Sequence, residues 1–236
     1  MRPLLAILTL ALTLAFALAP LLSDFSGFAT SQLPDAASDP PVQPAGYAFG
    51  IWGPIYLWLC ASAVWGLVYR ARDADWTRAR GPLCLSLAIG VPWLWIAERS
   101  PVWATVAIWA MLIFALVALP RTPAANRWWL RGPVALYTGW LTAASFVSLT
   151  TVLSGYGIAL DSYGWAFVGL AGTLGLAVLT YWNTPAPMYL VAVIWALIGI
   201  CVTTWMDAFL LTALSLTAIV TLVCVMAVRF PSDFRG

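Results

Sequence analysis

Eight long apolar runs follow one another along this chain, and they limit its fold more than any other feature. Of its 236 residues, 63% are hydrophobic and 8% charged, far from the composition of a soluble domain. A transmembrane helix needs about 20 apolar residues, and runs of roughly this length occur at residues 3–22, 47–69, 81–98, 102–119, 134–153, 164–182, 187–204 and 207–228. These unbroken runs do not fit the alternating strands of a barrel. The sequence therefore predicts an all-α integral membrane protein, folded as a polytopic helical bundle.

The arginines predict the orientation of this bundle. Every arginine except Arg99 lies before the first run, after the last run, or in a connection on the same side of the membrane as both ends. Positively charged loops stay in the cytoplasm. We therefore expect both termini to be cytoplasmic, in a bacterial inner membrane.

The first run has two interpretations. Arg2, the apolar stretch after it and the small residues of 15–19 also resemble a secretory signal peptide with its cleavage site. We favour an uncleaved first helix.

Residue types that are missing exclude several functions. The chain contains no histidine and no lysine, which excludes His-ligated haem or chlorophyll, a Ser-His-Asp triad and a retinal Schiff base within it. Its four cysteines lie inside apolar runs and form no Cys-x-x-Cys pair, so no metal site is expected. We predict no catalytic residue, no required cofactor and no nucleic-acid partner.

The second run opens with an aromatic segment, Phe49 to Tyr56. Phe49, Trp52 and Tyr56 are spaced i, i+3 and i+7, so a helix would place their rings along one face. Pro54 cannot donate a hydrogen bond, so we expect a bend there and a free carbonyl at Gly50. Such a face suits a flat apolar ligand. Simple packing between helices remains the alternative.

Two further segments are informative. Residues 23–46 form a proline-rich connection that could cover the mouth of the bundle as a lid or serve as a passive connector. In the fifth run Tyr137 and Trp140 share a face, and an adjacent polar stripe is predicted to join helices through Thr138, Thr142 and Ser145.

These segments resemble the TspO/MBR family, the tryptophan-rich sensory proteins related to the translocator protein (peripheral benzodiazepine receptor). Residues 49–56 (FGIWGPIY) resemble the family's entry into its second helix, and residues 137–143 (YTGWLTA) resemble its fifth-helix segment. Trp93 occupies a similar place to a family tryptophan. The resemblance covers residues 1–153 as a five-helix bundle and leaves 154–236 as an extension of three further transmembrane helices. Longer relatives resemble the whole chain.

The resemblance implies a ligand pocket between helices. Members of the family bind porphyrins, sterols and synthetic aromatic ligands, and several form homodimers. No basic residue follows Tyr137 closely, so a sterol-recognition motif is missing. The resemblance and the aromatic face together predict that the pocket is lined by Phe49, Trp52, Tyr56, Trp93, Tyr137 and Trp140.

The predicted function is therefore a membrane receptor or carrier for a planar hydrophobic ligand, a porphyrin or related tetrapyrrole, with a sensory or regulatory role. A bound lipid is a further possibility for the pocket, and the expected partners are the lipid bilayer and a second copy or larger membrane complex. Two alternatives stay open, an enzyme acting on bound porphyrin and a structural subunit of an assembly. The scarcity of charge inside the runs disfavours a secondary transporter.

Overall fold

The computed structural model describes residues 2–23, 28, 32–34 and 42–230. Among these residues the regular structure is helical without a strand, and eight helical spans are long and apolar enough to cross a membrane. This confirms the predicted fold class. The α-helices are α1 (Arg2–Leu18), α2 (Trp52–Arg70), α3 (Ala74–Gly90), α4 (Trp93–Arg99), α5 (Pro101–Ala118), α6 (Gly132–Gly155), α7 (Ser162–Asn183), α8 (Pro187–Thr204) and α9 (Phe209–Val228).

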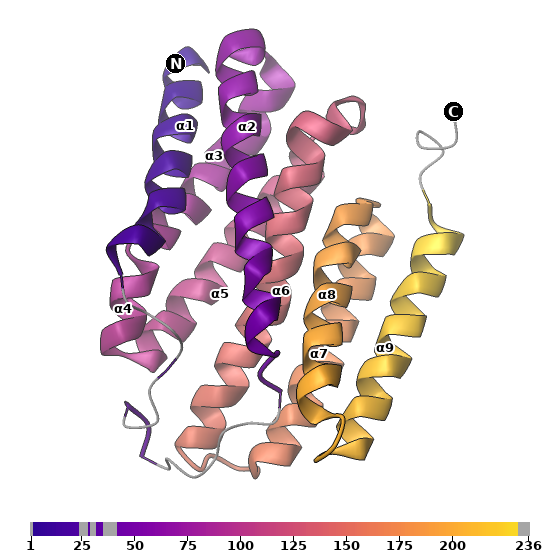
Figure 1. Ribbon diagram of the computed structural model, residues 1–236. Helices are drawn as coiled ribbons and strands as arrows, with labels where there is room; N and C mark the ends of the chain where they lie inside the picture. Colours follow the sequence, from indigo (N-terminus) through magenta and orange to yellow (C-terminus); the bar gives the residue numbers. More distant parts are fainter. Residues whose placement is uncertain (1, 24–27, 29–31, 35–41, 231–236) are drawn as a thin grey trace.

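Helix α6 forms the centre of the bundle. It packs against α5, α7 and α8 and also contacts α2. Its span is 72% buried, whereas the first, sixth and eighth spans are each 28% buried. Figure 1 shows α1 to α5 on one side of α6 and α7 to α9 on the other. The start of α1 and the end of α9 lie at the same end of the bundle.

The predicted division at residues 153 and 154 falls near the end of this central helix. Because α8 packs along α6, contacts cross that boundary over much of the length of α8. The separation into a five-helix bundle and a three-helix extension stays a prediction.

The third span is longer than predicted and is broken near its end. It begins at Ala74, because the Asp73 carboxylate caps the helix by accepting hydrogen bonds from the backbone N–H groups of Asp75 (2.9 Å) and Trp76 (3.3 Å). Val91 and Pro92 then separate α3 from α4. Pro92 has no N–H to continue the helical hydrogen bonds, so a new helix begins at Trp93.

The second span begins differently from the prediction at Pro54. A short 3-10 helix, η3 (Gly46–Ile51), precedes α2, and Pro54 lies in the first turn of α2. A proline costs little at this position, because the first N–H groups of a helix have no partner within it. The Gly50 carbonyl accepts a hydrogen bond from the Trp52 N–H, so the expectation of a free carbonyl there is wrong.

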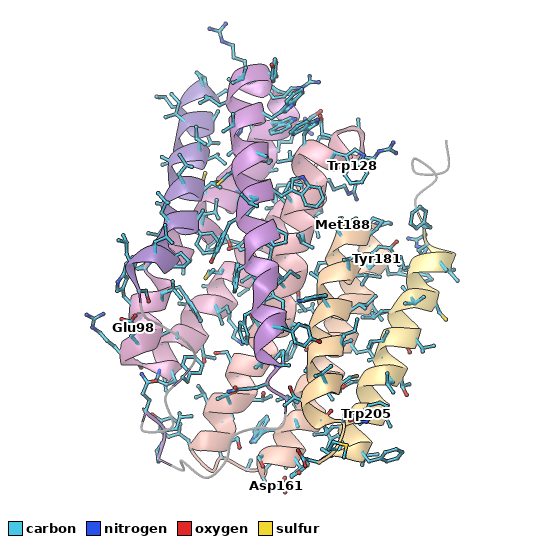
Figure 2. The ribbon with its side chains drawn as sticks, viewed as in Figure 1. Glu98, Trp128, Asp161, Tyr181, Met188 and Trp205 are labelled. Atoms are coloured by element: carbon cyan, nitrogen blue, oxygen red, sulfur yellow. The ribbon has the colours of Figure 1, made fainter. Side chains whose placement is uncertain are left out.

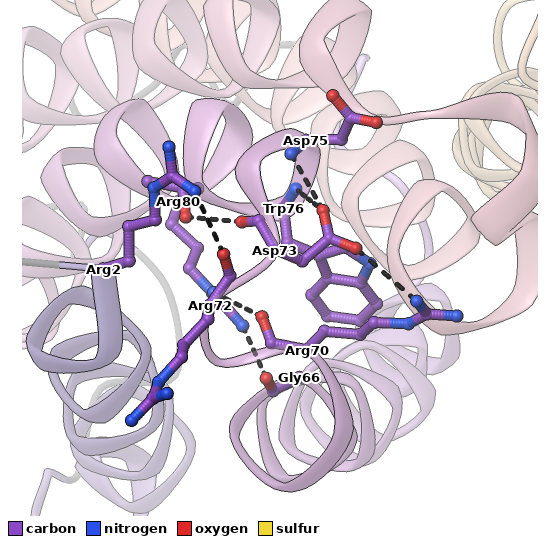
Figure 3. Close-up of polar contacts among 9 residues, drawn as sticks. Arg2, Gly66, Arg70, Arg72, Asp73, Asp75, Trp76 and Arg80 are labelled. Atoms are coloured by element: carbon purple, nitrogen blue, oxygen red, sulfur yellow. Dashed lines mark hydrogen bonds and ion pairs between the residues drawn. The ribbon is translucent and has the colours of Figure 1, made fainter.

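A buried arginine joins α2 and α3 at the arginine-rich end of the bundle (Figure 3). Arg80 donates hydrogen bonds to the carbonyls of Gly66 (2.7 Å) and Arg70 (3.1 Å), in the last turns of α2. Its guanidinium also lies 5.4 Å from the centre of the Trp76 ring. Gly66 has no side chain, which gives the Trp76 ring room against α2. Arg80 thus caps the C-terminal end of α2 from a neighbouring helix.

Candidate functional site

A cavity of about 140 Å³ lies in the half of the bundle away from the arginine-rich end. Phe49 of η3, Trp93 of α4, Ile108 of α5 and Ala196 of α8 form its walls together with one face of α6. The connection between the first two spans completes the walls with Phe28, Gln43 and Pro44. Figure 2 shows this end of the bundle near Asp161, opposite Trp128.

The side chains on the face of α6 that lines the cavity explain why the cavity is not filled. Its lining residues are spaced as neighbours on one helical face, beginning at Trp140 and ending at Thr151. Between these two lie the small side chains of Ala143, Ala144 and Ser148. These small residues leave room opposite the larger rings from other helices. The cavity is thus a consequence of small residues on the central helix.

Trp93 is held in place by a hydrogen bond. Its indole N–H donates to the carbonyl of Ala104 on α5, at 2.9 Å. Because α4 starts anew at Trp93 after the break at Pro92, this ring lies at the first turn of a separate helix. The break and the hydrogen bond together fix the orientation of one cavity wall.

Trp140 connects the cavity to an aromatic cluster. Its ring meets Phe49 edge-on, with ring centres 5.9 Å apart, and meets Trp52 edge-on at 6.2 Å. Trp52 in turn stacks on Tyr56, with centres 5.2 Å apart and planes 15° from parallel. Edge-on and offset stacked rings are the favoured arrangements of aromatic pairs.

Phe16 of α1 fills the middle of this cluster. It meets Trp52, Tyr56 and Tyr137 edge-on, with ring centres 5.8, 5.3 and 5.8 Å away. The Phe16 ring thus occupies the space beside these three rings, where the sequence predicted a ligand. Phe16 is itself buried and packs close to Gly90 of α3.

Tyr137 has a structural hydrogen bond. The Ser86 hydroxyl donates to the carbonyl of Met111 (2.8 Å) and lies 2.8 Å from the Tyr137 hydroxyl. Since a hydroxyl has one proton, Tyr137 donates to Ser86. This chain of hydrogen bonds ties α6 to α3 and α5.

The structure therefore brings the six predicted residues into one connected group. Three of them lie at the cavity and three lie in the aromatic cluster beside it. Phe49, Trp93 and Trp140 line the cavity, whereas Trp52, Tyr56 and Tyr137 lie in the adjoining aromatic cluster and do not line it. A ligand-binding role for all six stays a prediction.

Sequence reasoning missed several cavity residues. Phe28, Ser148 and Thr151 line the cavity but belong to no aromatic motif in the sequence. The i, i+3, i+4 recurrence of small residues after Trp140 could have indicated the α6 wall.

The predicted lid, residues 23–46, falls partly outside the described residues. Its described part is attached at both sides of the cavity. The Gln32 amide donates to the carbonyls of Ala97 (3.2 Å) and Glu98 (2.7 Å) at the end of α4, and the Ala45 N–H donates to the carbonyl of Gly199 on α8 (3.1 Å). Its described residues therefore hold the connection against α4 and α8 beside the cavity.

A comparison with protein families gives one match. The sequence model of the TSPO-like protein family matches residues 3–229. This chain belongs to the TSPO-like protein family. The match covers both the five spans that carried the resemblance and the three that follow. Comparison with curated proteins gives no significant match, and neither does comparison with solved structures.

Proposed function

We propose that this TSPO-like membrane protein is a non-catalytic receptor or carrier that binds a planar hydrophobic ligand in the cavity. One observation carries the proposal: rings from three different spans, Phe49, Trp93 and Trp140, line the same space. Contacts between aromatic rings are worth about 0.5–1.5 kcal/mol per pair beyond burial. Three such walls favour a flat aromatic ligand over a flexible chain.

The resemblance suggests a porphyrin or related tetrapyrrole as this ligand, and the size of the cavity sets a condition on it. A volume of about 140 Å³ compares with about 150 Å³ for a cavity that holds benzene, and drug-sized ligands occupy about 300 Å³ or more. A tetrapyrrole would therefore have to displace part of the wall. Phe28, Gln43 and Pro44 belong to a connection rather than to a spanning helix, so this wall is the one that can move at least cost. Such a displacement would give the sensory or regulatory signal.

Binding can be tested by titrating the purified protein with protoporphyrin IX and following tryptophan fluorescence. We expect saturable quenching, with an affinity that falls in Trp140→Ala and is kept in Trp103→Ala. Trp103 is a matched control, because its ring is 66% exposed on the outer face of α5. Quenching that does not saturate, or equal losses of affinity in both variants, would contradict a ligand site in the cavity.

For the cellular setting we propose a bacterial inner membrane with both termini in the cytoplasm. The distribution of arginines supports this orientation. A homodimer or a larger membrane complex is a further proposal that comes from the family resemblance.

A further inference from the structure

Five arginines lie at one corner of the arginine-rich end of the bundle, where α1 begins and α2 is followed by α3. This group, here called the basic corner, consists of Arg2, Arg70, Arg72, Arg78 and Arg80. Two aspartates lie among them. Asp73 pairs with Arg70 at 3.6 Å. Asp75 pairs with Arg78 at 3.4 Å.

The other two exposed arginines of the corner, Arg2 and Arg72, have no such partner. No carboxylate of the described residues pairs with either guanidinium. Arg2 Nη1 instead donates to the backbone carbonyl of Arg72, at 3.3 Å (Figure 3). In the same view the Arg72 side chain points away from Asp73 and Asp75. The hydrogen bond therefore brings a positive charge from α1 to a turn that already carries one.

The C-terminal end of α2 does not offset these charges. A helix carries a partial negative charge at this end, on carbonyls that have no partner within the helix. The carbonyls of Gly66 and Arg70 accept hydrogen bonds from the buried Arg80. The carbonyl of Arg72 accepts one from Arg2. An anion that approaches the corner therefore meets guanidinium groups at these three carbonyls.

Aromatic residues indicate the depth of the basic corner in the membrane. Trp65 of α2 stacks on Trp129, with ring centres 4.2 Å apart and planes 8° from parallel, and its ring centre lies 4.3 Å from that of Tyr69. Tyr69 and Trp129 are both exposed. Exposed tryptophan and tyrosine rings are enriched at the level of the lipid headgroups. Arg70 and Arg72 follow Tyr69 along the chain, so we expect their guanidinium groups at the level of the lipid phosphates.

We propose that the basic corner binds the headgroup of an anionic phospholipid from the adjacent leaflet, with Arg2 and Arg72 supplying the attraction. Clusters of four to eight basic residues next to a membrane span are typical of sites for anionic lipids. Phosphatidylcholine binds less well there, because its choline group already balances its phosphate. The occupant is a lipid rather than a soluble anion, because the corner lies at headgroup depth. The site is separate from the cavity, which lies in the other half of the bundle.

The test measures lipid binding at this corner alone. In a chain whose four native cysteines are replaced, a fluorophore is attached to a single cysteine at Ala74, an exposed residue at the start of α3. Phosphatidylcholine vesicles contain a spin-labelled quencher, which is either phosphatidylglycerol or phosphatidylcholine labelled at the same acyl carbon. Each basic residue near a membrane surface raises the association constant of an anionic lipid about 5-fold. With two such arginines we expect a preference for phosphatidylglycerol of about 5- to 25-fold. Equal quenching by the two lipids would overturn the proposal, even if no variant folds.

Two variants locate the contact. Arg72 takes part in the contacts of Figure 3 through its carbonyl, so Arg72→Gln removes a charge and leaves them in place. The preference for phosphatidylglycerol should fall about 5-fold. Arg229→Gln is the matched control, because it removes an exposed arginine at the same end of the bundle but at the end of α9, across the bundle from α1 (Figure 1). Equal losses in the two variants would overturn the assignment to the basic corner.

Ionic strength and free phosphate distinguish a lipid site from other kinds of binding. Attraction between exposed charges extends over about 8 Å at 0.15 M salt and about 3 Å at 1 M. The preference should therefore fall at 1 M salt, and an unchanged preference would contradict an electrostatic site. Replacing chloride by phosphate at constant ionic strength should have no effect. If phosphate alone removes the preference, the corner binds free phosphate and the assignment to a lipid is wrong.

Discussion

The backbone carbonyl of Tyr189 on α8 lies against Gly139 on α6, closer than a Cβ atom at residue 139 would permit. One turn further along α6, Thr142 Oγ1 lies 2.9 Å from the Tyr189 hydroxyl. The two helices therefore touch backbone to backbone and are also joined by a side-chain hydrogen bond. Small residues at such contacts are typical of helices that pack within membranes. Through this contact α8 attaches to the central helix.

Gly139→Ala should separate α6 from α8. An added methyl group would collide with the Tyr189 carbonyl and lie 3.0 Å from the Ala192 side chain, and a backbone carbonyl cannot turn away as a side chain can. We expect the free energy of unfolding to fall by about 1–3 kcal/mol, measured as a lower melting temperature in detergent. Gly175→Ala on α7 is the control, because nothing lies within 4 Å of the added atom. Equal melting temperatures for the two variants would contradict the close contact.

Thr142→Val should weaken the same interface by removing its hydrogen bond to Tyr189. Hydrogen bonds between membrane helices contribute about 0.6 kcal/mol on average and about 1.7 at most, so a modest loss of thermal stability is expected. Thr138→Val provides the comparison, since the Thr138 hydroxyl donates only to the Val134 carbonyl of its own helix, at 2.6 Å. A larger loss in Thr138→Val than in Thr142→Val would argue against the contact with α8.

Trp140→Ala should mainly weaken ligand binding, whereas Trp52→Ala should mainly lower stability. Trp140 lines the cavity, so its removal should weaken protoporphyrin binding by about 1–3 kcal/mol, roughly 5- to 150-fold. Trp52 stacks on Tyr56 and meets Phe16 instead, so its removal should lower the melting temperature and leave the affinity nearly unchanged. Both quantities are measured on the same preparation. A large loss of affinity in a fully stable Trp52→Ala variant would place Trp52 in the ligand site.

Arg80→Met should destabilise the arginine-rich end of the bundle. It leaves the carbonyls of Gly66 and Arg70 without the buried guanidinium, and a hydrogen bond to a charged group is worth about 1.5–3 kcal/mol. Arg78→Met, on the same helix, removes an exposed ion pair to Asp75 (3.4 Å) and should change stability by less than about 1 kcal/mol. The melting temperatures of the two variants test this expectation. Similar values would show that Arg80 does not cap α2.

The orientation can be tested with single cysteines in a chain whose four native cysteines are replaced. A cysteine at Arg72, in the turn between α2 and α3, should react with an impermeant maleimide in inverted vesicles only. A cysteine at Asp161, in the turn between α6 and α7, should react in right-side-out vesicles only. Both positions are exposed. The reverse labelling pattern would place the termini outside the cytoplasm.

The spans could be predicted because membrane insertion depends on local composition. Each apolar run carries its own signal, so all eight spans were found, and the family followed from the segments around Trp52 and Trp140. The start of α3 was placed too late, because the charged residues before Gly81 hid the capping by Asp73. Caps depend on one or two residues, which a hydropathy pattern does not detect.

The candidate site could be predicted only in part, because it depends on contacts between helices. Phe49 and Trp140 could be predicted as large aromatic residues at helical spacing, and Trp93 by the family resemblance. The sequence could not show that Phe16, far away on α1, fills the space beside Trp52 and Tyr56. Helical spacing assigns residues to a face, but which neighbour covers that face depends on the tertiary packing.

The burial of α6 also has a consequence for the order in which this protein is made. Its span has the lowest mean hydropathy of the eight, 1.3, and the side that later meets α8 carries the Thr142 hydroxyl. During synthesis α6 enters the bilayer before α7, α8 and α9 exist. Until α8 arrives, the hydroxyl of Thr142 and the bare backbone at Gly139 face acyl chains or the insertion machinery. The close contact at Gly139 can therefore form only after α8 has been made, late in the synthesis of this chain.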